Sequence, residues 1–361
     1  MELMEALGIT RASRTRNLEI GRTHFYGGSG PSRILAAMGV ALRSIGLGLC
    51  GSHSRVLLVR PEAATGEGAC ALHAIHTAYP HLVDLYQGPH PDWVGAGLIA
   101  SNLYQLILLD GVEVDDALAA AIVGAPHPVE VILTGEQLPP ALAGSIDLHS
   151  EHQCHCQTGI ANTALIHGDG KGKSTSALGL LLTAVSRILS GEDTRPVSLI
   201  QLLKGGAGYS RVGPYTEDPA IAALQRMTGL VDHHHFGDDR VIFKRVPPDH
   251  PNVRRPADYT EAQAGWSLAQ KHLLSGRYQA VLVDELNVAL DLELLGDEGE
   301  GQRLVRSAML LKQPDVAFIA TGRCWLENPH SEQLLGSYQQ HIEIRNSHHY
   351  GCASLRAGID W

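Results

Sequence analysis

The chain has 361 residues, of which 44% are hydrophobic and 18% charged, and its formal net charge is −10. This composition is typical of a globular protein with one large or two ordinary domains, and the acidic balance argues against a dedicated nucleic-acid binder. Met1–Asn17 has no apolar core of the signal-peptide type, and no apolar run approaches the roughly 18 residues of a membrane span. We therefore expect a cytoplasmic protein with no membrane partner.

The first predicted strand, loop and helix surround GGSGPSRILAAMG, Gly27–Gly39. Its glycines and the small apolar residues after them are typical of a phosphate-binding loop. The positions that would carry the working lysine and hydroxyl hold Arg33 and Ile34 instead. We interpret this loop as degenerate.

A second copy of the same pattern, HGDGKGKSTSALG, begins at His167, and Gly28 falls on Gly168 without a gap. Further along, LYQLILLDG (103–111) matches RYQAVLVDE (277–285), and VEVILTGE (129–136) matches VAFIATGR (316–323). RVLLVR (55–60) also precedes a helix-like segment, as VSLIQLLKG (197–205) does. Four landmarks in one order argue for a duplicated unit, although two unrelated doubly wound domains remain the alternative.

These landmarks predict the fold class and the domains. We expect an α/β protein of the P-loop NTPase type, with a mainly parallel sheet flanked by helices, in two tandem copies. Residues 1–150 would form the degenerate domain, and residues 151–361 the intact one. The linker, at about Ser150–Ala161, is not rich in Pro, Gly or Ser, so we expect the copies to pack tightly.

The second loop has every group that phosphate binding requires. Backbone N–H groups of the loop and the helix start would point at phosphate oxygens, Lys173 would supply a mobile charge, and the Ser174 hydroxyl could bind Mg²⁺. His167 stands where the usual pattern has glycine. The predicted nucleotide-binding residues are Gly168, Asp169, Gly170, Lys171, Gly172, Lys173, Ser174 and Thr175.

In AVLVDEL (Ala280–Leu286), four apolar residues lead to two carboxylates, Asp284 and Glu285. Ligands of open α/β sheets bind at the carboxyl ends of strands, where carboxylates can hold Mg²⁺ directly or through water. We predict that Ser174, Asp284 and Glu285 form the magnesium site. An acidic helix cap is the other interpretation of the two carboxylates.

The combination of GDGKGKST, the strand end LLKG, VDELNVALDLELL, IATGR and the terminal GIDW resembles the P-loop corrinoid adenosyltransferases, over about residues 162–361. Asp169 stands where that family has asparagine. The resemblance implies that a corrinoid Co(I) attacks the 5′ carbon of ATP and that triphosphate leaves. It implies catalytic roles for Lys173 and Arg323, and electrons supplied by a flavoprotein.

The resemblance also implies apolar side chains under the corrinoid ring, for which Phe236 and Phe243 are candidates, unless they are core residues. It implies homodimers, so the first copy could act as an internal partner of the second. The alternative function is an ATP- or corrinoid-binding regulatory protein without transfer activity. An ordinary ATP hydrolase is a weaker alternative.

Two histidine-rich segments remain. HSEHQCHC, His149–Cys156, offers possible metal ligands but lacks the paired spacing of a structural zinc site. We expect His233–His235 to be polar surface or the edge of a pocket and not metal ligands.

Overall fold

The computed structural model describes residues 22–28, 32–49, 55–60, 67–88, 96–125, 129–169, 172–204, 209–210, 213–214, 218–238, 242–297, 299–323 and 329–349. Among these residues, twelve strands form one sheet in the order β11-β8-β12-β13-β7-β14-β6-β1-β5-β4-β2-β3. The predicted α/β class with a mainly parallel sheet is confirmed.

The first part of the chain alternates strands and helices. Its elements are β1 (Thr23–Gly28), α3 (Ser32–Leu49), β2 (Val56–Arg60), α4 (Glu67–Ala78), β3 (Val83–Gln87), α5 (Ala96–Ala100), β4 (Leu106–Asp110), α6 (Asp116–Val123), β5 (Glu130–Thr134), the short 3₁₀ helix η2 (Pro140–Leu142) and β6 (Leu148–Cys156).

The second part repeats this alternation with longer helices. Its elements are β7 (Ile160–His167), α7 (Lys173–Leu189), β8 (Val197–Leu202), β9 (Tyr209–Ser210), β10 (Gly213–Pro214), α8 (Asp218–Thr228), β11 (Val231–Phe236), α9 (Pro256–Ser275), β12 (Ala280–Asp284), α10 (Leu286–Asp291), α11 (Glu300–Leu311), β13 (Ala317–Thr321), α12 (Pro329–Leu335) and β14 (Tyr338–His349).

The middle of the sheet is an antiparallel pair, β6 with β14, which we call the seam. The other strand pairs of this sheet are parallel. Outward from the seam the order is β6-β1-β5-β4-β2-β3 on one side and β14-β7-β13-β12-β8-β11 on the other. Chain order and sheet order therefore correspond strand by strand on the two sides. We call β1–β5 the first wing, and β7, β8, β11, β12 and β13 the second wing.

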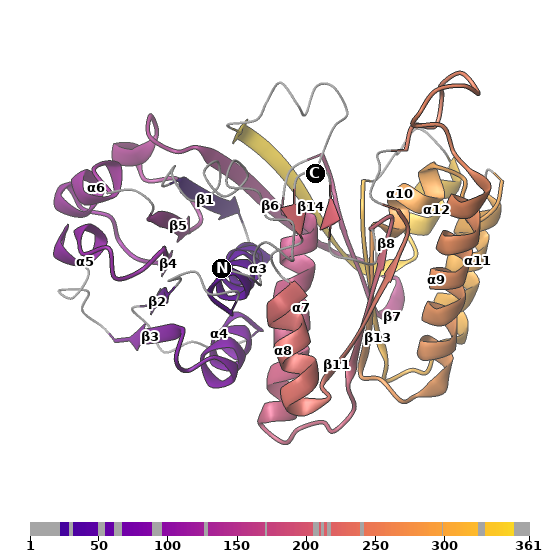
Figure 1. Cartoon of the computed structure of the whole chain (residues 1–361), viewed down its shortest axis with the longest axis horizontal. Coiled ribbons are helices and arrows are strands. Elements are labelled where there is room, and N and C mark those ends of the chain that lie inside the picture. The colour runs from indigo at the N-terminus through magenta and orange to yellow at the C-terminus, as the bar shows by residue number, and fades with distance from the viewer. Residues whose placement is uncertain are drawn as a thin grey trace.

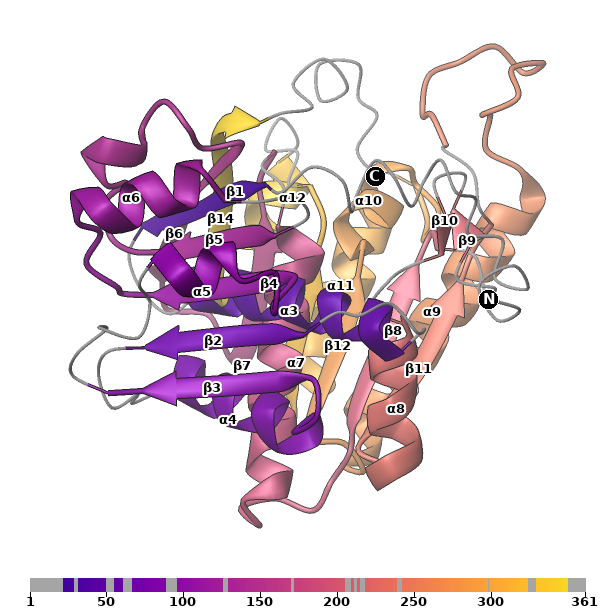
Figure 2. The same cartoon turned by 60° about the vertical axis from the view of Figure 1, so that its left-hand side comes forward.

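Four helices, α3, α4, α7 and α8, lie between the two wings (Figure 1). They share one apolar core, in which Leu35 and Leu42 of α3 join Leu178 and Leu182 of α7. Helices α5 and α6 cover the outer face of the first wing, as Figure 2 shows, while α9 to α12 cover the outer face of the second. No helix within the described ranges is long and apolar enough to cross a membrane.

Helices α3 and α7 approach each other closely through two glycines. A Cβ atom added to Gly39 would lie 2.0 Å from the backbone oxygen of Thr175, and one added to Gly179 would lie 2.2 Å from that of Leu35. The contact is reciprocal, since Gly39 follows Leu35 by four residues just as Gly179 follows Thr175. A missing side chain on each helix thus permits the backbones to touch.

Candidate functional site

The carboxylate of Asp284 is the centre of the candidate site. It lies at the end of β12, is 2% exposed, and accepts hydrogen bonds from Ser174 Oγ at 2.9 Å and Thr321 Oγ1 at 2.5 Å. Lys204 Nζ lies 2.6 Å from its second oxygen, and Gln201 Nε2 donates to the same oxygen at 3.2 Å. Both oxygens of this carboxylate are therefore fixed by the protein.

The topology explains why these side chains meet. Strands β8, β12, β13 and β7 are consecutive parallel neighbours, so their carboxyl ends share one edge of the sheet. Gln201 and Asp284 are directly paired across β8 and β12, and Thr321 ends β13. Helix α7 begins at this edge because it follows β7 after a short loop. This is the edge where open α/β sheets bind their ligands.

The two adjacent carboxylates differ in their electrostatics. Burial by itself would raise the pKa of Asp284, but Lys204 and the hydrogen bonds to the carboxylate hold that pKa well below its usual range. Burial and the neighbouring Asp284 raise the pKa of Glu285, while Lys204, Lys173 and Arg323 oppose the rise. Asp284 is thus a permanent anion, whereas the charge of Glu285 depends on the cations around it.

The backbone of Glu285 is unusual for a residue with a side chain. Its φ is +61°, in the left-handed region, and its N–H donates to Thr321 Oγ1 at 3.0 Å. For L-residues other than glycine this conformation costs about 1–2 kcal/mol. The corresponding residue of the first wing is Gly111, with a φ of +64°, for which the same conformation carries no such cost.

The glycine loop before α7 also requires special backbone angles. Gly168 and Gly172 have φ values of +113° and +115°. A Cβ atom on Gly168 would lie 2.2 Å from the backbone oxygen of Ile344, so this position next to the seam excludes a side chain. Thr175 is buried and donates to the Gly172 oxygen at 2.8 Å, which holds the loop on the first turn of α7.

The other predicted site residues fall into three groups. Lys173 opens α7 and Arg323 follows β13, and both are close enough to Glu285 to influence its charge. Asp169 is exposed, whereas Gly170 and Lys171 lie outside the described residues. The structure thus brings together Lys173, Ser174, Asp284, Glu285 and Arg323.

The two phenylalanines proposed for the corrinoid lie near the end of β11. Phe236 packs against α9, where a Cβ atom on Gly265 would lie 2.9 Å from its ring. Phe243 lies in the segment that follows, with its ring 5.8 Å from that of His250. Phe236 is therefore partly a packing residue, and its role toward a corrinoid stays a prediction.

The first wing keeps part of the same arrangement. Asp110, at the end of β4, accepts a hydrogen bond from the Thr134 hydroxyl, as Asp284 does from Thr321. Its other oxygen lies 3.1 Å from Arg60 Nε. Ile34 is a buried core residue, and Arg33 donates to the Gly28 backbone oxygen at 2.6 Å. The Arg33 guanidinium therefore binds the backbone at the end of β1.

Sequence reasoning did not assign Lys204, Gln201 or Thr321 to the site. The available signal was a lysine and a glutamine at the end of an otherwise apolar strand, in IQLLKG, where charge is unusual. Lys204 is 8% exposed and its ammonium pairs with Asp284. A buried lysine of this kind needs such a partner.

His167, which replaces the first glycine of the usual loop pattern, has a partner in the seam. Its Nε2 lies 3.0 Å from Nδ1 of His341 on β14, and the His341 ring stacks on that of His155 at 4.6 Å. Burial, and next the nearby His341, lower the pKa of His167 to about 4. At neutral pH it is an uncharged group that ties β7 to β14.

The fold and the site together define an α/β protein with a glycine loop, a hydroxyl and a cation-bound carboxylate at one sheet edge. Residues 160–361 match the model of the family described as ATP:corrinoid adenosyltransferase BtuR/CobO/CobP. The match covers more than half of the chain, and the protein belongs to this family.

Two curated proteins are similar to the chain. One is an uncharacterized protein of Nostoc sp., all2391, 35% identical over 98% of this chain and 99% of its own length. The other is a corrinoid adenosyltransferase of Pseudomonas aeruginosa, 30% identical over 35% of this chain and 51% of its own.

A carbohydrate transporter solute binding protein of Agrobacterium Radiobacter, solved with D-arabinose, covers 79% of each chain at 9% identity. Its TM-score of 0.23 carries no argument about this protein.

Proposed function

We propose that this protein transfers the 5′-deoxyadenosyl group of ATP to the Co(I) centre of a corrinoid. The cobalt–carbon bond forms as the C5′–O bond breaks, triphosphate leaves with the electron pair, and cobalt becomes formally Co(III). The proposal includes a flavoprotein as the source of the electrons that produce Co(I). Adenosylcobalamin biosynthesis or salvage would be its setting.

The observation that carries the proposal is the Ser174–Asp284–Lys204 group beside the glycine loop, within the segment that matches the family. The Ser174 hydroxyl is held at the first turn of α7, where helix N–H groups are unpaired and favour an anion. Lys173 and Arg323 add two positive charges near Glu285, since both lower its pKa. This arrangement suits a triphosphate.

The chemistry asks for positioning and charge stabilisation and not for a general base, because the nucleophile is the metal of the substrate. We propose that Lys173 and Arg323 stabilise the negative charge that grows on the leaving triphosphate. The loop residues Gly168–Gly172 would wrap the phosphates with their N–H groups.

An all-oxygen donor set of Ser174 and Glu285 fits Mg²⁺, which prefers hydroxyl, carboxylate and water oxygens. Lys204 already occupies one Asp284 oxygen. We therefore propose that Ser174 and Glu285 face the ion, and that Asp284 acts by orienting Ser174 or through water. Glu285→Gln should raise the Mg²⁺ concentration required for transfer, and an unchanged requirement would remove Glu285 from the metal site.

We further propose that the two wings descend from one duplicated unit, and that the first acts as a permanent internal partner of the second. Identical strand order about the seam and the reciprocal Gly39 and Gly179 contacts support this. In an isologous contact the same surface serves both partners, which is the pattern seen between α3 and α7. The first wing would then have no catalytic role, so Arg33 and Ile34 could replace the lysine and the hydroxyl residue of the loop.

The deciding experiment is incubation of the full chain with ATP, Mg²⁺ and chemically reduced cobalamin. Transfer gives a light-sensitive cobalt–carbon product and one triphosphate per product. Binding of ATP or the corrinoid without product would favour the alternative, a regulatory protein without transfer activity. Release of phosphate independent of corrinoid would indicate a hydrolase.

Lys173 and Arg33 form a matched pair for this assay because they occupy equivalent loop positions. Lys173→Ala should lower transfer by about 100-fold or more, as loss of a charge-stabilising donor does. Arg33→Ala should leave ATP binding unchanged. If the two substitutions had equal effects, the assignment of the nucleotide to the second loop would be wrong.

A further inference from the structure

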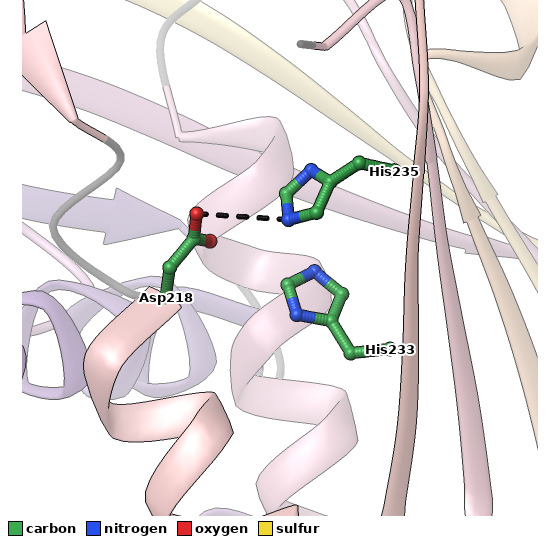
Figure 3. Close-up of side chains that lie close together, drawn as sticks. All are labelled: Asp218, His233 and His235. Atoms are coloured by element: carbon green, nitrogen blue, oxygen red, sulfur yellow. Dashed lines mark ion pairs between the residues drawn. The ribbon is translucent and has the colours of Figure 1, made fainter. Parts of the chain in front are cut away.

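The sequence alone favoured polar surface or a pocket edge for His233–His235, but their geometry with Asp218 points elsewhere. We propose that Asp218, His233 and His235 form a binding site for one divalent transition-metal ion of the Zn²⁺ class. Each residue offers one ligand atom, and these atoms lie within 4.8 Å of one another. Figure 3 shows the Asp218 carboxylate and the two imidazole rings converging from different elements. Among the described residues, these three form the group of His, Cys, Asp and Glu side chains with that geometry.

The alternation of β11 places the two histidines on one face of the strand. His233 and His235 are two residues apart and face α8, while His234 between them turns toward α9, with its ring 5.9 Å from that of His272. Asp218 is the first residue of α8. The site would therefore tie the start of α8 to the edge strand of the second wing.

The distances are close to those of a metal-bound state. His235 Nε2 lies 3.6 Å from Asp218 Oδ2, and the centroids of the two histidine rings are 4.3 Å apart. Ligands at about 2.0–2.1 Å from a tetrahedral zinc ion are separated by about 3.3 Å. Side-chain movements of a few tenths of an ångström would bring the ligand atoms of Asp218 and His235 to that separation.

Burial and an outer hydrogen bond favour a fixed site over loose surface histidines. The side chains of His235 and Asp218 are 14% and 22% exposed. His233 Nε2 lies 2.7 Å from Gln201 Oε1, and the amide nitrogen of Gln201 donates to Asp284. A ligand histidine held by a second polar group is the usual arrangement of metal centres.

The donor set selects the ion. Two imidazoles and one carboxylate suit Zn²⁺ and its first-row neighbours Co²⁺ and Ni²⁺, whereas Mg²⁺ and Ca²⁺ prefer oxygen ligands. Three protein ligands leave a fourth tetrahedral position for water. The ion would hold the start of α8 on β11, and Gln201 of β8 connects this site to Asp284 because it contacts both His233 and Asp284.

The test uses the full chain without a polyhistidine tag, stripped with chelator and titrated calorimetrically with Zn²⁺, and in parallel with Co²⁺ while visible absorption is recorded. We expect one ion per chain, and Co²⁺ bands with the intensity of a four-coordinate site. His233→Ala, His235→Ala and Asp218→Asn should each weaken Zn²⁺ binding at least about tenfold. Zn²⁺ should raise the Tm of the wild type.

His234→Ala is the matched control, because it removes a neighbouring histidine from the opposite face of the same strand. It should bind Zn²⁺ as the wild type does. Far-UV circular dichroism of the metal-free variants shows whether each is folded. No Zn²⁺ binding by the wild type, equal weakening in His234→Ala, or stoichiometric binding by a folded His233→Ala/His235→Ala variant would each overturn the proposal.

Discussion

Glu285 and Gly111 have nearly the same φ, +61° and +64°, at the ends of corresponding strands. Glutamate at this angle is strained, and its pKa is raised by burial and by the adjacent Asp284. Strained residues persist at functional sites because the surrounding structure fixes them. Glu285 therefore lowers the stability of the fold in return for a carboxylate at the sheet edge.

Glu285→Gly should separate these two effects. Relief of strain and removal of a buried acid should raise the free energy of unfolding by about 1 kcal/mol, after the entropy cost of a new glycine. Transfer activity should fall. Chemical denaturation and the cobalamin assay measure the two quantities. A less stable variant would contradict the strain argument, whatever its activity.

A second prediction concerns His152, which is fully buried in β6 and whose side chain forms no hydrogen bond within the described residues. Burial lowers its pKa to about 3, below the 6.5 of an exposed histidine. The unfolded chain therefore takes up the proton first as pH falls. Protonation of His152 therefore does not affect the free energy of unfolding above pH 6.5. Between pH 6.5 and pH 3 it lowers that free energy by about 1.4 kcal/mol per pH unit.

His152→Leu should flatten this pH dependence by one proton while keeping the fold, because the facing residue in β14 is the apolar Ile344. Denaturant unfolding at several pH values between 4 and 7 measures the slope. His73→Leu, which removes an exposed histidine of α4, is the control for the loss of a histidine from the surface. Parallel slopes for wild type and His152→Leu would contradict the prediction.

Local residues of the site were predictable from sequence, and distant ones were not. The strand, glycine loop and helix around Lys173 and Ser174 form a continuous stretch with its own signature. Lys204 and Thr321 are 80 and 37 positions from Asp284, and only the parallel order of β8, β12 and β13 brings them to it. The order of strands in a sheet depends on contacts between distant segments, so a local sequence pattern cannot predict it.

The contact between helices α3 and α7 leaves no room for a side chain at Gly39 or Gly179. Gly39→Ala and Gly179→Ala would each push a methyl group into backbone of the other helix. Backbone cannot rotate aside as a side chain can, so each substitution should destabilise the fold by about 1–3 kcal/mol or more. Gly97→Ala in α5 serves as the control for methyl addition, because a Cβ atom there would have nothing within 4 Å.

The measurement is Tm together with transfer activity. Because α7 carries Lys173 and Ser174 at its start, Gly179→Ala and Gly39→Ala should both reduce transfer at temperatures where the chain is still folded. If Gly39→Ala, in the first wing, changed neither Tm nor activity, the α3–α7 contact would not be the close one described here.

The sequence predicted the alternation of strands and helices along the chain better than it predicted which strands pair in the sheet. Residues 150–161 were interpreted as the linker between two copies, yet most of β6 lies within them, and residue 150 lies inside that strand. Alternating His, Glu and Cys residues in HSEHQCHC do not resemble a buried strand. β6 exists because β14 pairs with it, and that partner begins 182 residues later.

At the scale of the whole molecule, the seam and the shared helical core make the two wings dependent on each other. A fragment of residues 159–361 would lose β6 and expose the edge of β14, together with the apolar face of α7 that packs on α3. Exposed strand edges and apolar faces drive association. We expect this fragment to form a homodimer or to lose activity.

Light scattering gives the mass of the fragment, and the cobalamin assay gives its activity. Addition of the first wing as a separate chain should restore a lost activity. A monomeric fragment as active as the full chain would contradict the internal-partner proposal, because it would show that the second wing needs no neighbour.

Under the proposed duplication, His152 and Ile344 descend from one ancestral position, and they face each other across the seam. On the axis of a homodimer a residue must face its own copy, so one mutation always changes both sides at once. A single continuous chain has no such obligation. It can place an imidazole opposite an isoleucine in the β6–β14 pair, because each mutation there changes only one of the two facing residues.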